Sequence, residues 1–424
     1  MQMINVKSIG EKYTKVDHPS GLTIYMCPME GYSTAYAQFS TRYGSLDTCF
    51  KTKEDDDYLK VPEGIAHFLE HKMFEDEDGD AFGKFSKIGA NANASTSFDR
   101  TIYEFVCSEN FGESLKILIN MVTKPHFTDE SIAKEQGIIA QEIKMYNDEP
   151  GWCVYFNLLK ALYHNHPITI DIAGTVESIA KIDKELLYSC YNTFYNLHNM
   201  VLSVSGNFDM SEVVSICDEL LVKSSPLSIL RGEIVEPESV KQKNICLKKP
   251  VSVPMFEIGF KNHPIAPENT LRKMMADNIM LEILAGDCSP LYSRLYDNGK
   301  ITDSFGCSGM SNKGMFCNIF SGESNNPDEV LEELFSEIKL LRKKSISKAD
   351  FERTRKFYYG KLIMGYNNVE STASAMTSAF IQDRYPFEAV DILSEMKLDD
   401  IVCALENNLN FDKVAMSIVE PDKQ

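Results

Sequence analysis

Residues 64–71 read Gly-Ile-Ala-His-Phe-Leu-Glu-His, and the apolar spacing over residues 65–74 predicts a helix. His67 and His71 are one helical turn apart, so both imidazoles lie on one face of that helix, with Glu70 on the same side. Two histidines and a glutamate in the order His-x-x-Glu-His can bind one metal ion and act on a water molecule beside it. A catalytic zinc site needs three protein ligands and an open position, so the third ligand must come from elsewhere in the chain.

A second predicted helix, further along the chain, offers candidates for that ligand. It begins near Thr128, whose hydroxyl can cap the first turn. Glu135 and Glu142 are seven residues apart, hence on one face of this helix, which they share with Ile138 and Ile139. A carboxylate in an apolar stripe is costly to desolvate unless a cation or hydrogen bonds compensate its charge, and Zn²⁺ would do so. Either glutamate fits, and spacing alone does not order the two.

Strand-like and helical stretches alternate irregularly on both sides of these two helices. Apolar, β-branched or aromatic runs predict strands, and longer patterns of helical spacing separate them. Because the order lacks a regular strand–helix–strand alternation, an α+β fold is favoured. The predicted strands are residues 22–26, 34–43, 90–96, 101–107 and 199–204, and a further helix is predicted over residues 109–122.

A faint repeat relates the two ends of the chain. Residues 200–205 resemble residues 414–419 in residue type, and residues 35–43 resemble residues 256–263 at a similar offset. Residues 280–288, which align with the His-x-x-Glu-His helix at that offset, contain no histidine. The repeat therefore predicts two homologous halves, of which only the first holds a metal site.

A polar stretch at residues 223–243 separates the two repeated parts. It holds two prolines and one glycine and has no sustained periodicity, which is typical of a linker. We therefore predict an N-terminal half over residues 1–222 and a C-terminal half over residues 244–424. Each half is expected to be an α+β sandwich, in which helices pack on one face of a mixed or antiparallel sheet.

The composition excludes several classes of protein. The chain has 424 residues, 43% of them hydrophobic, which is typical of globular proteins and leaves room for two or three domains. Its 43 basic and 62 acidic residues give a formal charge of −19, which argues against nucleic acid or an anionic membrane as the partner. We find no signal peptide and no 18-residue apolar run, so a soluble, cytoplasmic protein is expected. The eleven cysteines are scattered without a Cys-x-x-Cys pair, as in proteins of a reducing compartment.

Together these motifs resemble the pitrilysin, insulysin and mitochondrial processing peptidase family of inverted-motif zinc metallopeptidases, in its short two-domain bacterial branch. In that family a glutamate ligand follows the inverted motif by some seventy-odd residues, and another glutamate precedes that ligand by seven. Here Glu142 follows His71 by 71 residues and Glu135 precedes Glu142 by seven. The resemblance implies that His67, His71 and Glu142 bind Zn²⁺, that Glu70 is the general acid and base, and that Glu135 supports a ligand or the water.

The stretch at residues 89–96, Gly-Ala-Asn-Ala-Asn-Ala-Ser-Thr, is similar to the strand on which this family pairs the substrate backbone. The resemblance implies that Asn93, Ala94, Ser95 and Thr96 bind an extended peptide. Main-chain pairing of this kind gives broad sequence selectivity. It also implies a closed clamshell chamber that admits peptides or unfolded polypeptide segments, to which the second half contributes without a metal.

The second half departs from the family at one motif. The family often has a Leu-Arg-Glu segment followed by Gly-Leu-x-Tyr, whose Arg and Tyr hold the substrate. Tyr296 stands where that Arg is expected, Arg294 is shifted by two positions, and no Tyr follows at the right distance. The chain is therefore predicted to pair with a related second subunit that supplies the two residues, with a heterodimer favoured over a homodimer.

The predicted activity is zinc-dependent hydrolysis of peptides by an endopeptidase of the processing-peptidase type. A non-catalytic or weakly active subunit, acting as the peptide-binding or assembly component of a heterodimeric peptidase, is the alternative. Members of the family that have lost hydrolysis usually lack an intact metal motif, whereas this chain keeps every ligand. The endopeptidase is therefore the favoured prediction.

Overall fold

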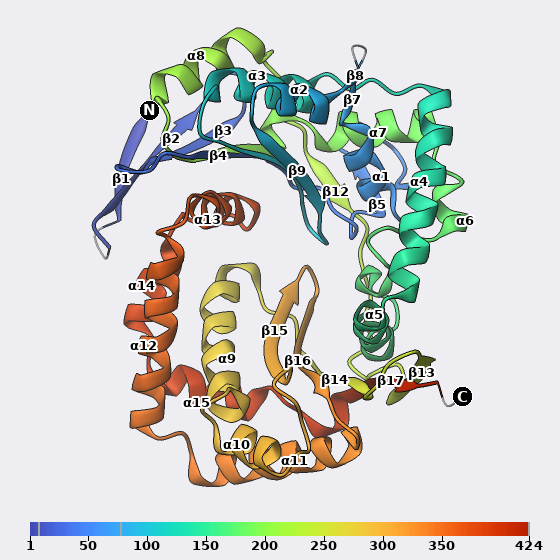
Figure 1. Cartoon of the computed structure of the whole chain (residues 1–424), viewed down its shortest axis with the longest axis vertical. Helices are drawn as coiled ribbons and strands as arrows, with labels where there is room; N and C mark the ends of the chain where they lie inside the picture. The colour runs from blue at the N-terminus through green and yellow to red at the C-terminus, as the bar shows by residue number, and fades with distance from the viewer. Residues whose placement is uncertain (7–8, 77–78, 423–424) are drawn as a thin grey trace. The chain divides into compact units, whose positions relative to one another are not determined.

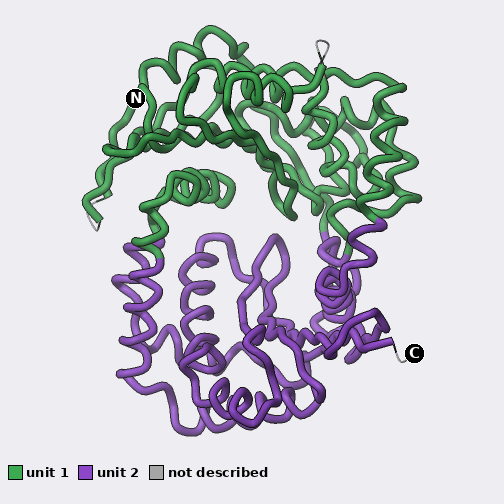
Figure 2. Tube along the Cα trace, viewed as in Figure 1, with its two compact units in different colours: residues 1–143, 170–233, 362–388 green, residues 144–169, 234–361, 389–424 purple. Residues whose placement is uncertain are grey.

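The computed structural model describes residues 1–6, 9–76 and 79–422. The described chain forms two compact units, each assembled from segments that are distant in the sequence (Figure 2). Unit 1 comprises Met1–Ile143, Ile170–Glu233 and Leu362–Glu388, and unit 2 comprises Lys144–Thr169, Ile234–Lys361 and Ala389–Gln424. Each unit therefore includes a segment from the opposite half of the sequence. The predicted division into continuous halves of residues 1–222 and 244–424 describes the sequence repeat, and its boundaries stay a prediction.

Unit 1 is built on a seven-stranded sheet in the order β1-β2-β3-β11-β4-β10-β9 (Figure 1). β3 and β11 are parallel, and the other neighbours are antiparallel. β9 is an edge strand, since it pairs with β10 alone among the described strands. The strands are β1 (Gln2–Val6), β2 (Glu11–Asp17), β3 (Thr23–Pro28), β4 (Ala35–Thr41), β9 (Asn91–Thr96), β10 (Thr101–Cys107) and β11 (Met200–Gly206).

Most helices of unit 1 pack on one face of this sheet, as predicted. Phe39, Tyr103 and Leu202 point from the sheet into this core, where they meet Phe68 and Leu69 of α1. Burial of these large apolar side chains is the main force that fixes α1 against the sheet. The helices are α1 (Ile65–Lys72), α2 (Ala81–Lys87), α3 (Phe111–Thr123), α4 (Asp129–Asp148), α6 (Val176–Ile179), α7 (Lys184–Phe194) and α8 (Met210–Leu220), of which α4 extends into unit 2.

The opposite face of the unit 1 sheet carries a helix that was not predicted there, α13 (Val369–Ile381). Met376 of α13 packs in an apolar cluster with Tyr25 and Val201 of the sheet, and hydrogen bonds add to this contact. Gln38 Nε2 donates to Ser374 Oγ at 3.0 Å, and Thr377 Oγ1 donates to Ser203 Oγ at 2.9 Å. Both faces of the sheet are therefore covered, one by the main apolar core and the other by a smaller apolar cluster and hydrogen bonds from one segment of the second half.

Unit 2 repeats the topology of unit 1 with fewer strands. Its five-stranded sheet has the order β13-β17-β14-β16-β15, with β13 and β17 parallel and the other neighbours antiparallel. This is the arrangement of β3-β11-β4-β10-β9 in unit 1, so the predicted α+β class with two homologous halves is confirmed. The strands are β13 (Asn244–Lys249), β14 (Met255–Asn262), β15 (Gly306–Asn312), β16 (Met315–Glu323) and β17 (Val414–Pro421).

Helices also cover both faces of the unit 2 sheet. α5 packs on one face, where Gly259 of β14 allows the close approach of Leu158 and Leu162. On the other face Phe260 contacts Phe335 of α11, and α9 packs on β15. The helices are α5 (Pro150–Leu162), α9 (Thr270–Ala285), α10 (Pro290–Asp297), α11 (Pro327–Lys344), α12 (Lys348–Gly365), α14 (Glu388–Glu395) and α15 (Leu398–Asn407).

The predicted linker is anchored within both units. Its first part forms β12 (Ile229–Arg231), which pairs with β5 (Cys49–Thr52) of unit 1, and β5 pairs in turn with β6 (Leu59–Lys60). Further on, Glu236 pairs with Lys261 of unit 2 at 2.6 Å. The remaining described strands form the hairpin of β7 (Glu75–Asp76) and β8 (Gly79–Asp80). Across the described parts of the chain, no helix has the length and apolarity that crossing a lipid bilayer requires.

Candidate functional site

Helix α1 is held in one orientation by its sequence. Its N-cap residue, Gly64, has a φ of 85°, and a side chain there would overlap the carbonyl oxygen of Ala173. Phe68 and Leu69 are completely buried in the core of unit 1. Because the helix can neither slide nor rotate without exposing these rings and methyl groups, its polar face has a fixed direction.

Two histidines of α1 and one glutamate of α4 converge on a single point. The rings of His67 and His71 have centroids 4.6 Å apart. Glu142 Oε1 lies 3.6 Å from His67 Nε2, and Glu142 Oε2 lies 3.4 Å from His71 Nε2. Within residues 1–6, 9–76 and 79–422, these three residues are the one group whose possible ligand atoms lie within 4.8 Å of one another.

The spacing of these atoms fits a metal ion. Ligand atoms about 2.1 Å from zinc in tetrahedral geometry are separated by about 3.4 Å. Two imidazoles and one carboxylate are also a common set of donors at catalytic zinc sites, where a fourth position stays open. The side chains of His67, His71 and Glu142 could therefore hold Zn²⁺.

Glu135 makes a different contact from Glu142, which spacing alone could not distinguish. Its Oε1 lies 2.9 Å from His71 Nδ1, and only 6% of the residue is exposed. When Nδ1 donates its proton to Glu135, His71 Nε2 keeps a lone pair that faces Glu142. Burial lowers the pKa of His71, but its hydrogen bond with Glu135 and the nearby carboxylates outweigh burial, so this pKa is raised.

The buried stripe of α4 differs in one position from the prediction. Ile138 is 46% exposed, so the expectation that it shares a face with the two glutamates is wrong. The residues of α4 that are buried follow the spacing of three and four that keeps a straight helix in contact with one core. They are Ile132, Glu135, Ile139 and Ile143.

Glu70 lies in an environment that suits a proton carrier. It is 7% exposed, and burial raises its pKa, although the charge of His67 and a hydrogen bond from Thr96 oppose the rise. Thr96 Oγ1 donates to Glu70 Oε2 at 2.8 Å. A carboxylate whose pKa is moved toward neutrality can both accept and release a proton near physiological pH.

The predicted peptide-binding residues lie on the edge strand β9, beside α1. Their exposure alternates along the strand, with Asn93 and Ser95 exposed and with Ala94 and Thr96 partly buried. Asn93 Oδ1 accepts the backbone N–H of Ala94 at 3.0 Å. The outer edge of β9 pairs with no other described strand, so its main-chain groups are available to an added strand.

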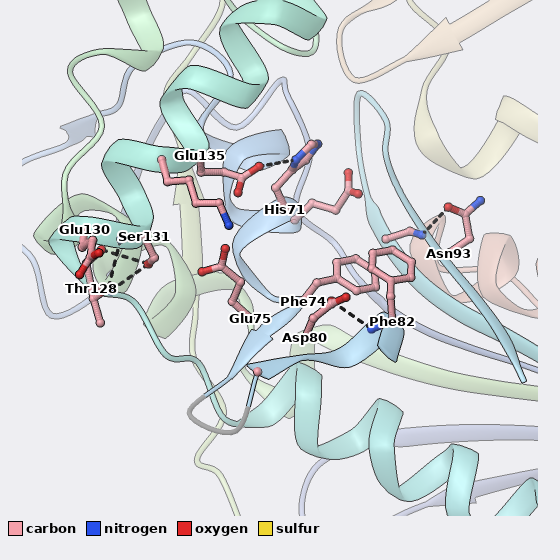
Figure 3. Close-up of a pocket in the computed structure, with 14 residues that line it drawn as sticks. His71, Phe74, Glu75, Asp80, Phe82, Asn93, Thr128, Glu130, Ser131 and Glu135 are labelled. Carbon is pink, nitrogen blue, oxygen red and sulfur yellow. Dashed lines mark hydrogen bonds and ion pairs between the residues drawn. The ribbon is translucent and has the colours of Figure 1, made fainter. Parts of the chain in front are cut away.

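A pocket of about 950 Å³, which the sequence did not suggest, lies beside Glu70 and His71 (Figure 3). Phe74 and Phe82 form part of its wall and stack with their ring centroids 4.1 Å apart and their planes 3° from parallel. The charged residues around the pocket are mostly acidic. They include Glu75, Asp80, Glu130 and Glu135, together with Lys134.

Arg294 and Tyr296, which lie at the motif where the second half differs from the family, contact other residues of unit 2. Arg294 Nη2 lies 2.8 Å from Glu337 Oε2, and Arg294 Nε lies 3.3 Å from Glu333 Oε2. Tyr296 is 49% exposed and stacks on Tyr292. Arg294 is therefore held by two carboxylates of α11.

The fold and the site define a class of metallopeptidase-like proteins, in which two α+β units share a topology and one of them carries the inverted histidine motif. The chain belongs to the insulinase family of peptidases, family M16. The family model described as "Insulinase (Peptidase family M16)" matches residues 54–176, and the one described as "Peptidase M16 inactive domain" matches residues 181–358.

Relatives and solved structures agree with this assignment. The chain is 38% identical to the uncharacterized zinc protease YmfH of Bacillus subtilis, and the match covers 95% of each chain. It is 26% identical to an uncharacterized zinc protease of Rickettsia felis, over 90% of this chain and 92% of the relative. The crystal structure of an M16-like peptidase from Alicyclobacillus acidocaldarius matches with a TM-score of 0.92 and 34% identity, covering 97% of this chain and 98% of the other.

Proposed function

We propose that this chain is a zinc-dependent endopeptidase that hydrolyses peptides or unfolded polypeptide segments. One observation carries the proposal: the possible ligand atoms of His67, His71 and Glu142 lie within 4.8 Å of one another, and the nearby carboxylate of Glu70 is buried. Relatives that are named zinc proteases support the same chemistry. The non-catalytic alternative does not need an intact set of three donors next to a carboxylate.

In this proposal different residues of unit 1 bind the metal, transfer the proton and orient a metal ligand. His67, His71 and Glu142 would hold a zinc ion, which would supply Lewis acidity toward a water molecule and the peptide carbonyl. The Glu70 carboxylate accepts the proton that the attacking water loses and then delivers it to the nitrogen of the leaving amine. Glu135 orients the His71 ring through Nδ1.

The substrate is proposed to bind as an extended strand on the free edge of β9. Main-chain hydrogen bonds to residues 93–96 would hold it, which makes selectivity for sequence broad. A side chain next to the cleaved bond can enter the pocket formed by Phe74 and Phe82. No nucleic acid or membrane partner is proposed, and the cytoplasmic location stays a prediction from the sequence.

A related second subunit is proposed to complete a clamshell chamber, with a heterodimer favoured over a homodimer. Arg294 is engaged by Glu333 and Glu337, which leaves the substrate-holding Arg and Tyr of the family without an evident equivalent. Activity of the isolated chain that rises when a related subunit is added would support this part of the proposal. Full activity of the chain alone would contradict it.

The decisive experiment compares wild type with Glu70→Gln on a quenched peptide, while zinc content is measured in parallel. We expect one zinc per chain in both proteins and a fall in kcat of roughly 100- to 10,000-fold in the variant, because proton transfer is lost. Glu109→Gln, which changes an exposed glutamate before α3, is the matched control. Equal activity of Glu70→Gln would remove Glu70 from its role, and zinc-loaded wild type without activity, with or without a partner, would favour the non-catalytic alternative.

A further inference from the structure

Strand β9 contributes a side chain to the site as well as an edge. Thr96, its last residue, donates its hydroxyl to Glu70 Oε2 at 2.8 Å across 26 residues of sequence. We propose that Thr96 is a positioning residue that fixes the carboxylate of Glu70 for proton transfer. This inference rests on the proposed function, because it concerns the same site.

The need for such a residue follows from the chemistry of the glutamate side chain. The terminal torsion of glutamate joins an sp³ carbon to an sp² carbon, so its distribution is broad and the carboxylate is free to rotate. A hydrogen bond to one oxygen restricts that rotation and gives the other oxygen a single orientation. Among the described residues, the Thr96 hydroxyl is the one recorded hydrogen-bond donor to the Glu70 carboxylate.

The fold holds Thr96 where this bond can form. Side chains alternate along β9, so Thr96 and Ala94 face the same side of the strand, and α1 packs against β9. Thr96 is in register with Thr101 of β10, and the backbone turns tightly just beyond it, where Ser97 N donates to the Arg100 carbonyl at 2.8 Å. Threonine is β-branched, so its χ1 angle is stiff and its hydroxyl keeps its direction.

The same strand is the one on which the substrate backbone is proposed to pair. Thr96 therefore has two roles in this proposal. Its main chain lies on the strand that would receive the peptide, and its side chain orients Glu70, the general base for peptide hydrolysis. Loss of the hydroxyl should impair the chemical step while the binding of zinc and of the peptide is retained.

The test compares Thr96→Val, which keeps the shape of the side chain without the hydroxyl, with Thr96→Ser, which keeps the hydroxyl. For a quenched peptide we expect Thr96→Val to lower kcat by roughly 10- to 100-fold with KM and zinc content unchanged, because a misplaced catalytic group costs about this much. Thr96→Ser should restore most of the rate. Thr123→Val is the matched control, since Thr123 makes a similar hydroxyl bond, 2.7 Å to the carbonyl of Ile119, on α3.

A second readout does not depend on activity or on metal. The infrared carboxylate band of Glu70, obtained from metal-free protein by subtraction of the Glu70→Gln spectrum, should shift in Thr96→Val and keep its wild-type position in Thr96→Ser. An unchanged band, or an unchanged kcat in Thr96→Val, would overturn the positioning role. If zinc-loaded wild type lacks activity with or without a partner, while the band is shifted in Thr96→Val, the proposed function is contradicted and the contact on which this inference is built is supported.

Discussion

Units 1 and 2 share five strands in the same order and direction, yet among the described residues only unit 1 brings together three side chains that could bind one metal ion. In unit 1, α1 places two histidines opposite a glutamate of α4. In unit 2, the helix between the equivalent strands, α9, places a buried carboxylate, Asp277, against Asn318 and Asn408, whose amide groups donate to it. Burial raises the pKa of Asp277 to about 7. The shared fold thus places a helix with polar residues between equivalent strands in both units. The side chains of that helix determine whether its polar groups bond to one another, as in unit 2, or could bind a ligand, as in unit 1.

A second contrast lies on the sheet faces that receive α13 and α5. Gln38 of unit 1 is in register with Ser203, and Glu257 of unit 2 is in register with Ser417 in the equivalent strands. Gln38 donates to Ser374 of α13, whereas Glu257 Oε2 has no hydrogen-bond partner among the described residues. Burial raises the pKa of Glu257 to about 8. One unit therefore has a neutral amide where the other buries an acid.

The largest effect is expected from removing a proposed zinc ligand of unit 1, the unit that differs from unit 2 in its metal donors. His71→Ala should lower zinc affinity by roughly 1,000-fold, because a third of a zinc-binding free energy of about 10–16 kcal/mol is about 4 kcal/mol. His164→Ala, which alters a histidine of unit 2, should leave one zinc per chain. Metal analysis and competition with a chromogenic chelator measure both. Retention of tight zinc binding in His71→Ala would exclude the site described for unit 1.

A smaller effect is expected from the contact that orients His71. Glu135→Gln removes the charge beside Nδ1 while keeping a hydrogen-bond acceptor, and it should weaken zinc binding by roughly 10- to 100-fold, as partners behind metal ligands commonly do. The same chelator competition measures it. Glu177→Gln, an exposed glutamate of unit 1, provides the comparison. If both variants bind zinc as wild type does, Glu135 has no part in the metal site.

The smallest effect is expected from replacing Glu257, the buried acid of unit 2, by glutamine, the residue that unit 1 has at the equivalent position, Gln38. Between pH values of about 4.5 and 8, folded protein keeps a proton on Glu257 that the unfolded chain releases, because burial raises the pKa of Glu257 to about 8. The free energy of unfolding therefore falls as the pH rises through this window. Glu257→Gln should remove the part of that fall that Glu257 contributes, while the part due to Asp277 remains. The variant should be more stable than wild type by about 1–2 kcal/mol at pH 9, a gain limited by the desolvation cost of the buried amide.

Thermal unfolding of wild type and Glu257→Gln at pH 4 and pH 9 measures the effect, and the two proteins should differ least at pH 4. The reciprocal Gln38→Glu variant should acquire the pH dependence that Glu257→Gln loses. A Glu257→Gln variant with the same decline in stability as wild type would show that Glu257 does not titrate in this window.

The sequence predicted those parts of the site that depend on local spacing. One helical turn separates His67 from His71, and two turns separate Glu135 from Glu142, so the shared faces follow from helix geometry alone. The helix predicted to begin near Thr128 begins at Asp129, and the strand predicted over residues 101–107 has those bounds. The two glutamates could not be ordered from spacing, because their different contacts depend on where α4 crosses α1.

The features that the sequence did not predict arise between distant segments. Phe74 stacks on Phe82, and Thr96 donates a hydrogen bond to Glu70. Both contacts join separate elements, so the spacing of residues within one helix or strand does not predict them. The placement of α13 was missed for a related reason. Ser374 and Thr377 give that helix a polar face that is typical of solvent exposure, although in unit 1 this face bonds to the sheet.

The segment that supplies α13 has a consequence for biosynthesis. Unit 1 takes in residues up to Glu388, so a ribosome must have added residues 234–361 of unit 2 before the last helix of unit 1 exists. Until then the nascent sheet exposes Gln38 and Ser203 without the helix that bonds to them. Unit 1 can thus be completed only after residues 234–361 of unit 2 have been translated, and a product that ended before Val369 would be left with an incompletely covered sheet.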